Sequence, residues 1–433
     1  MEIEGGRDSH TFGGTKMIIP SIDLMNGKAV QLVNGNEQMI KVERDDPVMI
    51  AKGFNRYGEL AVIDLDAALG KGENRDLIAQ ICTLAECRVG GGIRTIEEGD
   101  EILLAGAKKI IVGTKADPEF LSSFNKERVI VALDMKGKNI ATHGWKQTVH
   151  QNPLDRAIEL QDYCNEFLFT DVQREGKLEG INLEMAKLIK SKTENQLTYA
   201  GGISSIEEIK QLENENINSQ IGMALYTSTI RLTDAFVSLI DFEKNNGLVP
   251  TVVQEEGTGK VLMVAYSSQE SLKETLGDEW DQRDHYAVYF SRSRGSLWKK
   301  GESSGNLQKL VKARYDCDRD TLLFVVNQNG NACHTGTKTC FNETKFSVKE
   351  LERIIQDRKE GPTKIGSYTQ RVLTEPGLIE EKLREELSEL LEHTDRKNLI
   401  WEAADLMYFF VTYLVKHGIR LSEIENELWR RRS

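Results

Sequence analysis

The sequence predicts a multidomain protein that begins with an α/β TIM barrel of the (β/α)8 type and continues into a small β-rich domain and an all-α domain. Three observations support this fold class: an internal repeat in the first half of the 433 residues, short Val/Ile-rich segments around three cysteines, and a carboxylate-rich helical pattern near the end. We place the barrel at residues 17–241, the β-rich domain at 242–345 and the helical domain at 346–433. A chain of this length is expected to form about two to four domains, each with its own core.

The repeat in the first half is visible in pairs of motifs at nearly constant spacing. Strand-like runs end at Asp23 and Asp134, 111 residues apart, and the segment GGGIRTIEE recurs as AGGISSIEE. Similar offsets across several motifs indicate two copies of one half. In each copy, Val/Ile-rich runs alternate with helical stretches such as 96–105 and 206–213, which is typical of parallel βα units. Two four-stranded halves form a (β/α)8 barrel, whose active face is built by the loops after the strands.

The repeat also predicts a pseudosymmetric site. Asp23 and Asp134 end strands in opposite halves, so their carboxylates should face each other across the barrel opening. Glycine turns that lead into helix N-termini can bind phosphate, and such turns occur in both halves at Gly91, Gly92, Gly113, Gly201, Gly202 and Gly222. A substrate with a phosphate at each end and acid/base chemistry in the middle fits, as in an aldose-to-ketose Amadori rearrangement. The structural alternative is an aspartate that caps a helix and glycines that form tight turns.

Residues 17–241 resemble, over their whole length, the histidine-pathway isomerase that converts ProFAR, the formimino-linked bis-phosphoribosyl carboxamide, into its ribulosyl form. The resemblance rests on the motifs IPSIDL, VGGGIRT, ALDM, HGW and AGGI. It implies that Asp23 is the general base and Asp134 the general acid, that Trp145 stacks on the substrate as a lid, and that Thr170 assists.

Several barrel residues depart from the isomerase pattern. Gln31 and Met223 stand where the family has arginines, and its Arg-Asp-Gly-Thr motif contains Glu175 and Lys177 at the second and fourth positions. Each lost arginine removes a bidentate charge-assisted hydrogen bond worth about 1.5–3 kcal/mol. An alternative therefore stays open, in which the barrel is a catalytically impaired scaffold or a ligand-binding module and only the two C-terminal activities are retained.

Composition and charge argue against several other classes of function. The net charge of −12 argues against nucleic-acid binding, which needs a basic face. No apolar run is long enough to span a membrane. Six cysteines lack the density of a disulfide scaffold, so a reducing, cytoplasmic location is expected. Residues 1–16 are polar and glycine-rich, which predicts a disordered extension and not a secretory signal.

The segment 316–341 carries the chemistry expected of the β-rich domain. Alternating aspartates would share one face of an extended backbone and suit Mg²⁺. Three cysteines are one ligand short of a closed tetrahedral site, as in a catalytic zinc site that keeps a position for water. The segment upstream supplies cations and hydroxyls suited to phosphate. These residues are Asp316, Asp318 and Asp320; Cys317, Cys333 and Cys340; and Arg292, Arg294, Lys300, Ser303 and Ser304. Buried structural cysteines and an ordinary acidic turn are the alternative.

These two segments closely resemble phosphoribosyl-AMP cyclohydrolase of histidine biosynthesis, through the motifs SRS, LWKKGESSG, DCDRD, CH and TCF. That reaction adds water at C6 of an N1-substituted adenine and opens its six-membered ring. Zinc suits this step because it lowers the pKa of bound water to about 7, and His334 would carry the proton. The resemblance further implies that cysteines from two subunits share the zinc, and hence an obligate homodimer.

The last domain combines clustered carboxylates with helical periodicity after a polar linker at 358–372. Glu385, Glu386 and Glu389 lie within KLREELSELLEH, where Glu385 and Glu389 share a face. In WEAADLMYFFVTYL, Glu402 and Asp405 also share a face, and apolar neighbours on every side predict a buried helix. Buried carboxylates need a cation, so this pattern favours Mg²⁺. For the first helix alone, a solvated acidic surface is the alternative.

The pattern EExxE…ExxD resembles the all-α nucleotide pyrophosphohydrolases, and the SYT of residues 367–369 narrows the resemblance to phosphoribosyl-ATP pyrophosphatase. It implies Mg²⁺ held against the triphosphate, cleavage between the α and β phosphates, and dimers. The three resemblances name consecutive steps that run from the C-terminal to the N-terminal domain, with small phosphoribosyl nucleotides as substrates. A nucleotide-sensing protein without turnover is the alternative from another class. The intact cysteines argue against it, since a sensor needs no open zinc site.

Overall fold

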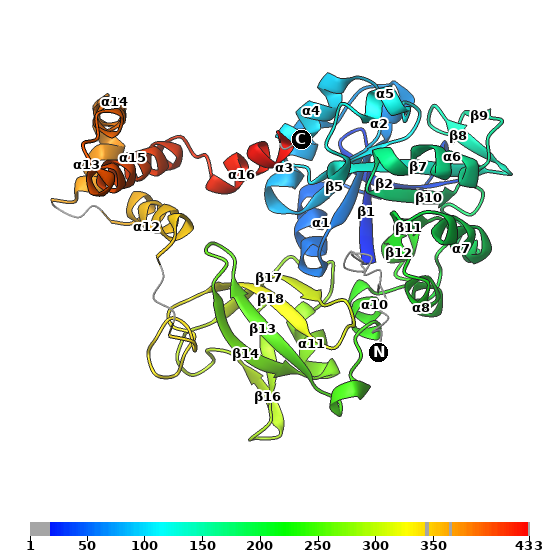
Figure 1. Ribbon diagram of the computed structural model, residues 1–433. Coiled ribbons are helices and arrows are strands. Elements are labelled where there is room, and N and C mark those ends of the chain that lie inside the picture. Colours follow the sequence, from blue (N-terminus) through cyan, green and yellow to red (C-terminus); the bar gives the residue numbers. More distant parts are fainter. Residues whose placement is uncertain (1–17, 343–345, 363–365, 432–433) are drawn as a thin grey trace, which may run out of the picture.

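The computed structural model describes residues 18–342, 346–362 and 366–431. The extension expected at residues 1–16 lies outside these ranges. Figure 1 shows a barrel, a smaller β-rich part and a helical part in chain order. In the described part of the chain, no helix is both long enough and apolar enough to cross a membrane.

Eight parallel strands close the barrel, which confirms the predicted fold class. Each strand pairs with the next in sequence and the last pairs with the first. Their order is β1 (Ile18–Met25), β4 (Leu60–Asp64), β5 (Cys87–Gly90), β6 (Lys109–Val112), β7 (Val129–Lys136), β10 (Glu166–Asp171), β11 (Gln196–Ala200) and β12 (Asn218–Ile221).

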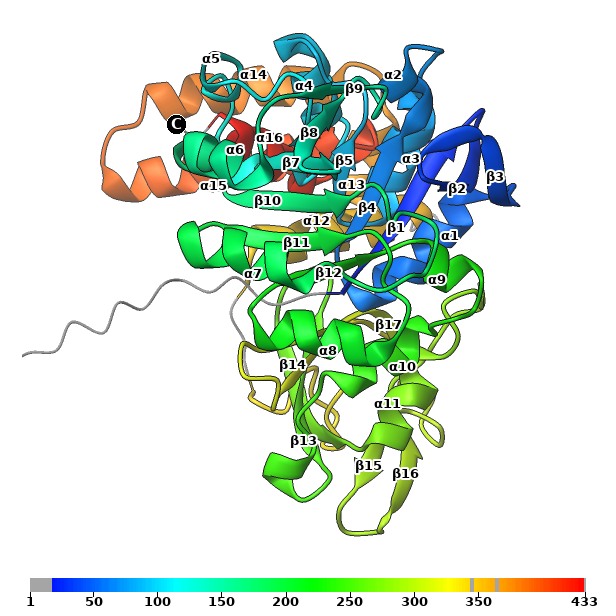
Figure 2. The ribbon, with the colours of Figure 1, turned by 90° about the vertical axis from the view of Figure 1, so that its right-hand side faces the viewer.

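Helices surround the barrel on the outside (Figure 2). They are α1 (Pro47–Phe54), α3 (Arg75–Leu84), α4 (Ile96–Leu104), α6 (Pro153–Leu160), α7 (Leu183–Lys192), α8 (Ile206–Asn214) and α10 (Leu232–Ser238), with the short α2 (Leu65–Leu69), α5 (Pro118–Leu121) and α9 (Met223–Tyr226). The predicted helices at 96–105 and 206–213 appear as α4 and α8. Both begin with a capping box, formed by Thr95 with Glu98 and by Ser205 with Glu208. The repeated motif therefore encodes a glycine turn followed by a reciprocally hydrogen-bonded helix start.

Two hairpins extend the barrel at its C-terminal face. The first joins β2 (Lys28–Val33) to β3 (Asn36–Arg44) after β1, and the second joins β8 (Asn139–Thr142) to β9 (Gln147–Val149) after β7. They occupy corresponding places in the two halves, as the repeat predicts.

The β-rich part contains a four-stranded sheet in the order β14–β13–β18–β17 and a separate hairpin, β15–β16. The strands are β13 (Val249–Glu255), β14 (Val261–Ser267), β15 (Val288–Ser291), β16 (Ser296–Lys299), β17 (Gln308–Tyr315) and β18 (Leu322–Gln328). Its helix is α11 (Gln269–Leu276). One cluster of buried apolar side chains runs through the barrel and the β-rich part without interruption.

The helical part consists of α12 (Val348–Glu360), α13 (Tyr368–Thr374), α14 (Leu378–Leu391), α15 (Arg396–Lys416) and α16 (Leu421–Arg430). Two predictions were wrong here. The helices do not begin after a linker at 358–372, because α12 precedes most of this segment and α13 begins within it. The helix that carries Glu402 is not buried within this chain: Trp401 is 67% exposed and Ile400 56% exposed. The neighbouring helices cover only one side of α15, and its apolar residues continue around the other.

Candidate active sites

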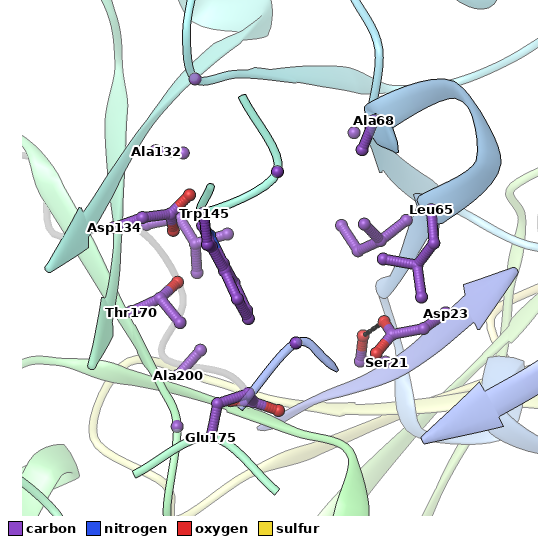
Figure 3. Close-up of a pocket in the computed structure, with 18 of the residues that line it drawn as sticks. Ser21, Asp23, Leu65, Ala68, Ala132, Asp134, Trp145, Thr170, Glu175 and Ala200 are labelled. Carbon is purple, nitrogen blue, oxygen red and sulfur yellow. Dashed lines mark hydrogen bonds between the residues drawn. The ribbon is translucent and has the colours of Figure 1, made fainter. Parts of the chain in front are cut away.

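A cavity of about 210 Å³ lies at the C-terminal ends of the barrel strands. Asp23 and Asp134 stand on opposite sides of it, and Trp145, Thr170 and Glu175 line it between them (Figure 3). Every glycine predicted for phosphate binding also lines this cavity: Gly91, Gly92, Gly113, Gly201, Gly202 and Gly222. The structure therefore brings together the candidate residues of both halves in one cavity.

Each aspartate has hydroxyl or indole groups beside it. Ser21 Oγ donates a hydrogen bond to Asp23 Oδ1 at 2.9 Å, but burial outweighs this bond and raises the pKa of Asp23 to about 6. Burial also raises the pKa of Asp134, opposed by hydrogen bonds from Trp145 and Thr170. Thr170 lies beside Asp134 because β10 and β7 pair in register at these residues.

Glu175 adds a third carboxyl group to the cavity. It lies in the loop after β10, where the isomerase pattern has aspartate. Burial, together with the negative charges of Asp23 and Asp134, raises the pKa of Glu175 to about 8. The cavity thus holds titratable groups with separated pKa values, which is the arrangement that general acid–base catalysis requires.

The β2–β3 hairpin borders the cavity and contacts the other loops. The backbone N–H of Asn34 donates to the Glu175 carbonyl oxygen at 3.0 Å. Gly35 lies so close to the Trp145 ring that a Cβ atom would overlap it. Gln31 is buried beside Gly222, and its Nε2 has no hydrogen-bond partner among the described residues.

The β-rich part brings two of its three candidate cysteines together. Cys333 and Cys340 lie near enough to shift each other's pKa, and Cys333 Sγ lies 3.0 Å from Thr335 Oγ1. The Thr335 hydrogen bond is the main cause that lowers the pKa of Cys333 to about 6. Cys317 does not join this pair: among the described residues the three sulfur atoms form no group within 4.8 Å of one another. The chain alone therefore supplies a pair of thiols, not the predicted set of three.

The three aspartates of this part converge, but not for the predicted reason. Strand β17 ends at Tyr315, and Asp316, Asp318 and Asp320 lie in a turn in which Arg319 has φ +65°. Extended backbone was therefore the wrong expectation. The turn still brings one carboxylate oxygen of each aspartate within 4.8 Å of the others.

The residues predicted to bind phosphate in the β-rich part lie on and around the β15–β16 hairpin. Arg292 lies over the Tyr266 ring at 3.7 Å and Arg294 over the Trp298 ring at 5.5 Å. Lys300 is buried, and desolvation lowers its pKa against the opposing charges of Cys340 and Cys333. Ser303 and Ser304 are exposed in the turn that follows. His334 Nδ1 lies 4.0 Å from Cys333 Sγ.

In the helical part, Glu386 and Glu389 of α14 meet Glu402 of α15, with one oxygen of each within 4.8 Å of the others. Asp405 lies outside this group but raises the pKa of Glu386, for which desolvation is the larger cause. Glu385 is exposed and paired with Lys382 at 2.6 Å. Glu385 and Glu389 lie near each other as the spacing predicts, since desolvation and the charges of Glu402 and Glu385 raise the pKa of Glu389, but it is Glu386 and not Glu385 that joins Glu389 and Glu402.

A second cavity, about 740 Å³, opens beside the SYT motif. Ser367 and Tyr368 line it, together with four cationic side chains: Arg358, Lys359, Arg371 and Lys416. These cations were not predicted from the sequence, because they are dispersed through a polar segment and a helix end. Their proximity to the motif suits a polyphosphate.

Three protein families match successive segments of the chain. Residues 17–231 match the family described as histidine biosynthesis protein, residues 263–342 match phosphoribosyl-AMP cyclohydrolase, and residues 348–432 match phosphoribosyl-ATP pyrophosphohydrolase. A ProFAR isomerase of Methanocaldococcus jannaschii is 39% identical over 230 residues, which are 51% of this chain and 97% of that protein. The chain belongs to the histidine biosynthesis enzymes. It is a multifunctional member that joins an isomerase, a cyclohydrolase and a pyrophosphohydrolase.

Two further relatives each match about half of the chain. A histidine biosynthesis bifunctional protein of Pyrococcus furiosus is 41% identical over 207 residues, 45% of this chain and 95% of that protein. A histidine biosynthesis trifunctional protein of Kluyveromyces lactis is 35% identical over 232 residues, 53% of this chain and 27% of that protein.

Two further side chains at these sites were not predicted from the sequence. Ser21 supports Asp23, and a strand's alternation could have revealed it, because residues i and i+2 face the same side. Lys244 pairs with Asp318 at 2.7 Å and also with Asp320. It comes from the segment between the barrel and the β-rich sheet, so no local pattern indicates the contact.

Proposed function

We propose that one chain carries out three consecutive reactions on phosphoribosyl nucleotides, in order from its C-terminal to its N-terminal domain. Residues 346–433 release pyrophosphate from phosphoribosyl-ATP, residues 242–345 open the adenine ring of the product, and residues 17–241 isomerise the resulting ProFAR. The observation that supports turnover in the barrel is the single cavity with Asp23 and Asp134 on opposite sides and glycine turns of both halves around it.

In the barrel, we assign Asp23 as general base and Asp134 as general acid. Asp23, with its pKa near 6, is ionised at neutral pH and can accept a proton from the substrate carbon. Asp134 receives hydrogen bonds from Trp145 and Thr170, which orient it toward the sugar-ring oxygen that must be protonated for ring opening. The glycine turns of the two halves bind the two phosphates through backbone N–H groups.

In the β-rich part, we assign Cys333 and Cys340 as zinc ligands. The lowered pKa of Cys333 provides a thiolate near neutral pH, which is the form that binds metal. Bound zinc would supply hydroxide for attack on the adenine ring. His334 carries the proton, while Arg292, Arg294, Lys300, Ser303 and Ser304 bind the phosphoribosyl group. Asp316, Asp318 and Asp320 are the candidate magnesium ligands.

We further propose a homodimer, in which Cys317 of a second copy completes the zinc site. The separation of Cys317 from the other two cysteines supports this arrangement. An exposed apolar surface on α14 and α15 also supports a dimer, because contiguous apolar surface of this kind marks protein–protein contacts. It consists of Leu387, Leu391, Ile400, Trp401, Met407 and Phe410.

In the helical part, we assign Glu386, Glu389, Glu402 and Asp405 as the main magnesium ligands, with Glu385 at the edge of the cluster. Three carboxylates in contact repel one another, and a divalent cation relieves this repulsion. The basic cavity beside Ser367 and Tyr368 is suited to the triphosphate.

Replacement of Asp134 tests the barrel assignment. Asp134→Asn keeps the shape of the side chain and removes its proton. We expect ProFAR turnover to fall by about 10²–10⁴-fold, while the two upstream reactions in the same preparation continue at the wild-type rate. Turnover of ProFAR at the wild-type rate by this variant would contradict the assignment of the general acid.

A further inference from the structure

The segment Gly277–Asp281, which follows α11 in the cyclohydrolase part, is bonded into the barrel. Arg56 donates hydrogen bonds to two of its backbone oxygens. The backbone N–H of Leu232, at the start of α10, donates to Glu279 Oε1 at 2.9 Å. Gly53 of α1 approaches the Glu279 carbonyl so closely that a Cβ atom would overlap it. The segment is therefore fixed against two barrel helices.

Trp280, within this segment, contacts the barrel with its ring. It packs edge-on against Tyr226, with ring centroids 5.1 Å apart, and against Phe54 at 5.4 Å. The guanidinium of Arg44 lies over the ring, 5.3 Å from its centroid. Such aromatic pairs and cation–π contacts each stabilise a defined relative orientation.

These contacts reach two elements that border the catalytic cavity. Tyr226 ends the short helix α9, whose first residues line the cavity next to Gly222. Arg44 ends β3, and the turn of the same hairpin lines the cavity at Gly35. Figure 2 shows α9, the hairpin and α11 on the same side of the molecule. Trp280 thus contacts both α9, which follows the glycine turn at Gly222, and the β2–β3 hairpin.

Apart from the backbone hydrogen bond of its N–H to the Gly222 carbonyl oxygen, packing holds the Tyr226 side chain in place. Its hydroxyl is buried and has no hydrogen-bond partner in the described part of the chain. Phe54 and Trp280 are its ring partners, and they contact each other as well. Loss of the indole would leave Tyr226 with one aromatic neighbour and Arg44 with none.

We propose that Trp280 is a positioning residue of the isomerase, supplied to the barrel by the cyclohydrolase part of the same chain. It holds α9 and the β2–β3 hairpin in the arrangement that binds the phosphate end of ProFAR. This inference rests on the proposed turnover of ProFAR in the barrel. The phosphate end of ProFAR does not react. Disorder of α9 and the hairpin would therefore weaken binding of the substrate and of the transition state equally, which raises KM and leaves kcat nearly unchanged.

Steady-state kinetics with ProFAR on full-length variants tests this proposal. Trp280→Leu keeps apolar bulk but removes the ring, and we expect it to raise KM about 5- to 10-fold with kcat within about twofold. Trp280→Phe restores a ring and should return KM to within about threefold of wild type. Arg44→Gln, at an exposed side chain, should raise KM about twofold to threefold. The KM of the cyclohydrolase reaction should stay the same in all three.

Phe236→Leu is the matched control. Phe236 crosses the same interface, with its ring centroid 5.3 Å from that of Tyr315, but contacts neither α9 nor the hairpin through an aromatic ring. We expect a lower Tm and an unchanged KM for ProFAR. An unchanged KM in Trp280→Leu, or an equal rise in Phe236→Leu, overturns the proposal. Wild-type protein without any ProFAR turnover would overturn both the proposal and the assigned isomerase activity.

Discussion

Three carboxyl groups share the barrel cavity, and burial raises the pKa of each: Asp23 to about 6, Glu175 to about 8, and Asp134 above its ordinary value. At neutral pH, Asp23 is ionised and Glu175 protonated. A base and a neutral hydrogen-bond donor can therefore coexist in one apolar cavity. Glutamate in place of aspartate at position 175 keeps a carboxyl group in the cavity.

These pKa values predict a bell-shaped pH dependence of kcat/KM for ProFAR. Activity should fall below about pH 6, because a protonated Asp23 cannot accept a proton. It should also fall above about pH 8, because ionised Glu175 adds a negative charge beside the substrate phosphates. Initial rates at low substrate concentration between pH 5 and 9.5, in a buffer of constant ionic strength, measure both limbs.

Two variants identify the groups behind the limbs. The hydrogen bond from Ser21 lowers the pKa of Asp23, so Ser21→Ala should move the acid limb to higher pH. Glu175→Gln cannot ionise and should abolish the alkaline limb. Identical limbs in both variants and wild type would show that other groups control the profile.

Cys333 is the residue on which the proposed zinc site depends most. Cys333→Ala should remove bound zinc and cyclohydrolase turnover while pyrophosphate release continues at the wild-type rate, since the helical part uses carboxylates. Elemental analysis of the purified protein and separate assays of the two reactions measure this. Cys82→Ala, at a half-buried cysteine of the barrel, is the control and should retain zinc. Loss of pyrophosphate release in Cys333→Ala alone would mean that the metal supports the whole assembly.

Among the structural elements, the sequence pattern predicted those strands and helices whose bounds depend on local residue patterns. Barrel strands follow from the repeat and from strand periodicity. Helices α4 and α8 begin at the capping boxes of Thr95 and Ser205. Asp23 and Asp134 followed from the strand ends, whereas Trp145 and Thr170 were expected only from the family resemblance. The turn at Asp316–Asp320 was missed because alternation in the sequence does not reveal a left-handed residue, here Arg319. The burial expected for α15 was wrong within this chain, because an apolar pattern does not say which surface covers a helix, and Trp401 stays exposed here.

The exposed face of α15 predicts the oligomeric state. Trp401 at its centre should be buried against the second copy in solution, and Trp401→Glu places a charge in that interface. We expect wild type to sediment as a dimer and the variant as a monomer at micromolar concentration. If Cys317 of one copy completes the zinc site of the other, the monomer should also lose cyclohydrolase activity. Glu381→Ala, at an exposed residue of α14, should remain dimeric. A Trp401→Glu variant that remains dimeric would show that this face of α15 is not the dimer interface.

At the scale of the molecule, the barrel and the β-rich part are joined by ion pairs as well as by a common core. Glu86 of the barrel lies 2.9 Å from Lys312, and Glu213 pairs with Arg319. The helical part also reaches the barrel, where Arg128 lies over the Trp429 ring at 4.6 Å. Sequence alone could not predict these contacts, because they join residues far apart in the chain and follow no periodicity. The barrel therefore contacts both of the other parts of the chain.

The measurement that most directly tests the proposed reaction series follows phosphoribosyl-ATP through the purified wild-type chain in the presence of Zn²⁺ and Mg²⁺. Chromatography of samples taken over time would separate phosphoribosyl-AMP, ProFAR and the ribulosyl product. We predict that pyrophosphate release is followed by ring opening and then by accumulation of the ribulosyl product, without any added enzyme. A reaction that stops at ProFAR would contradict this, and would leave the barrel as a scaffold for the two C-terminal activities.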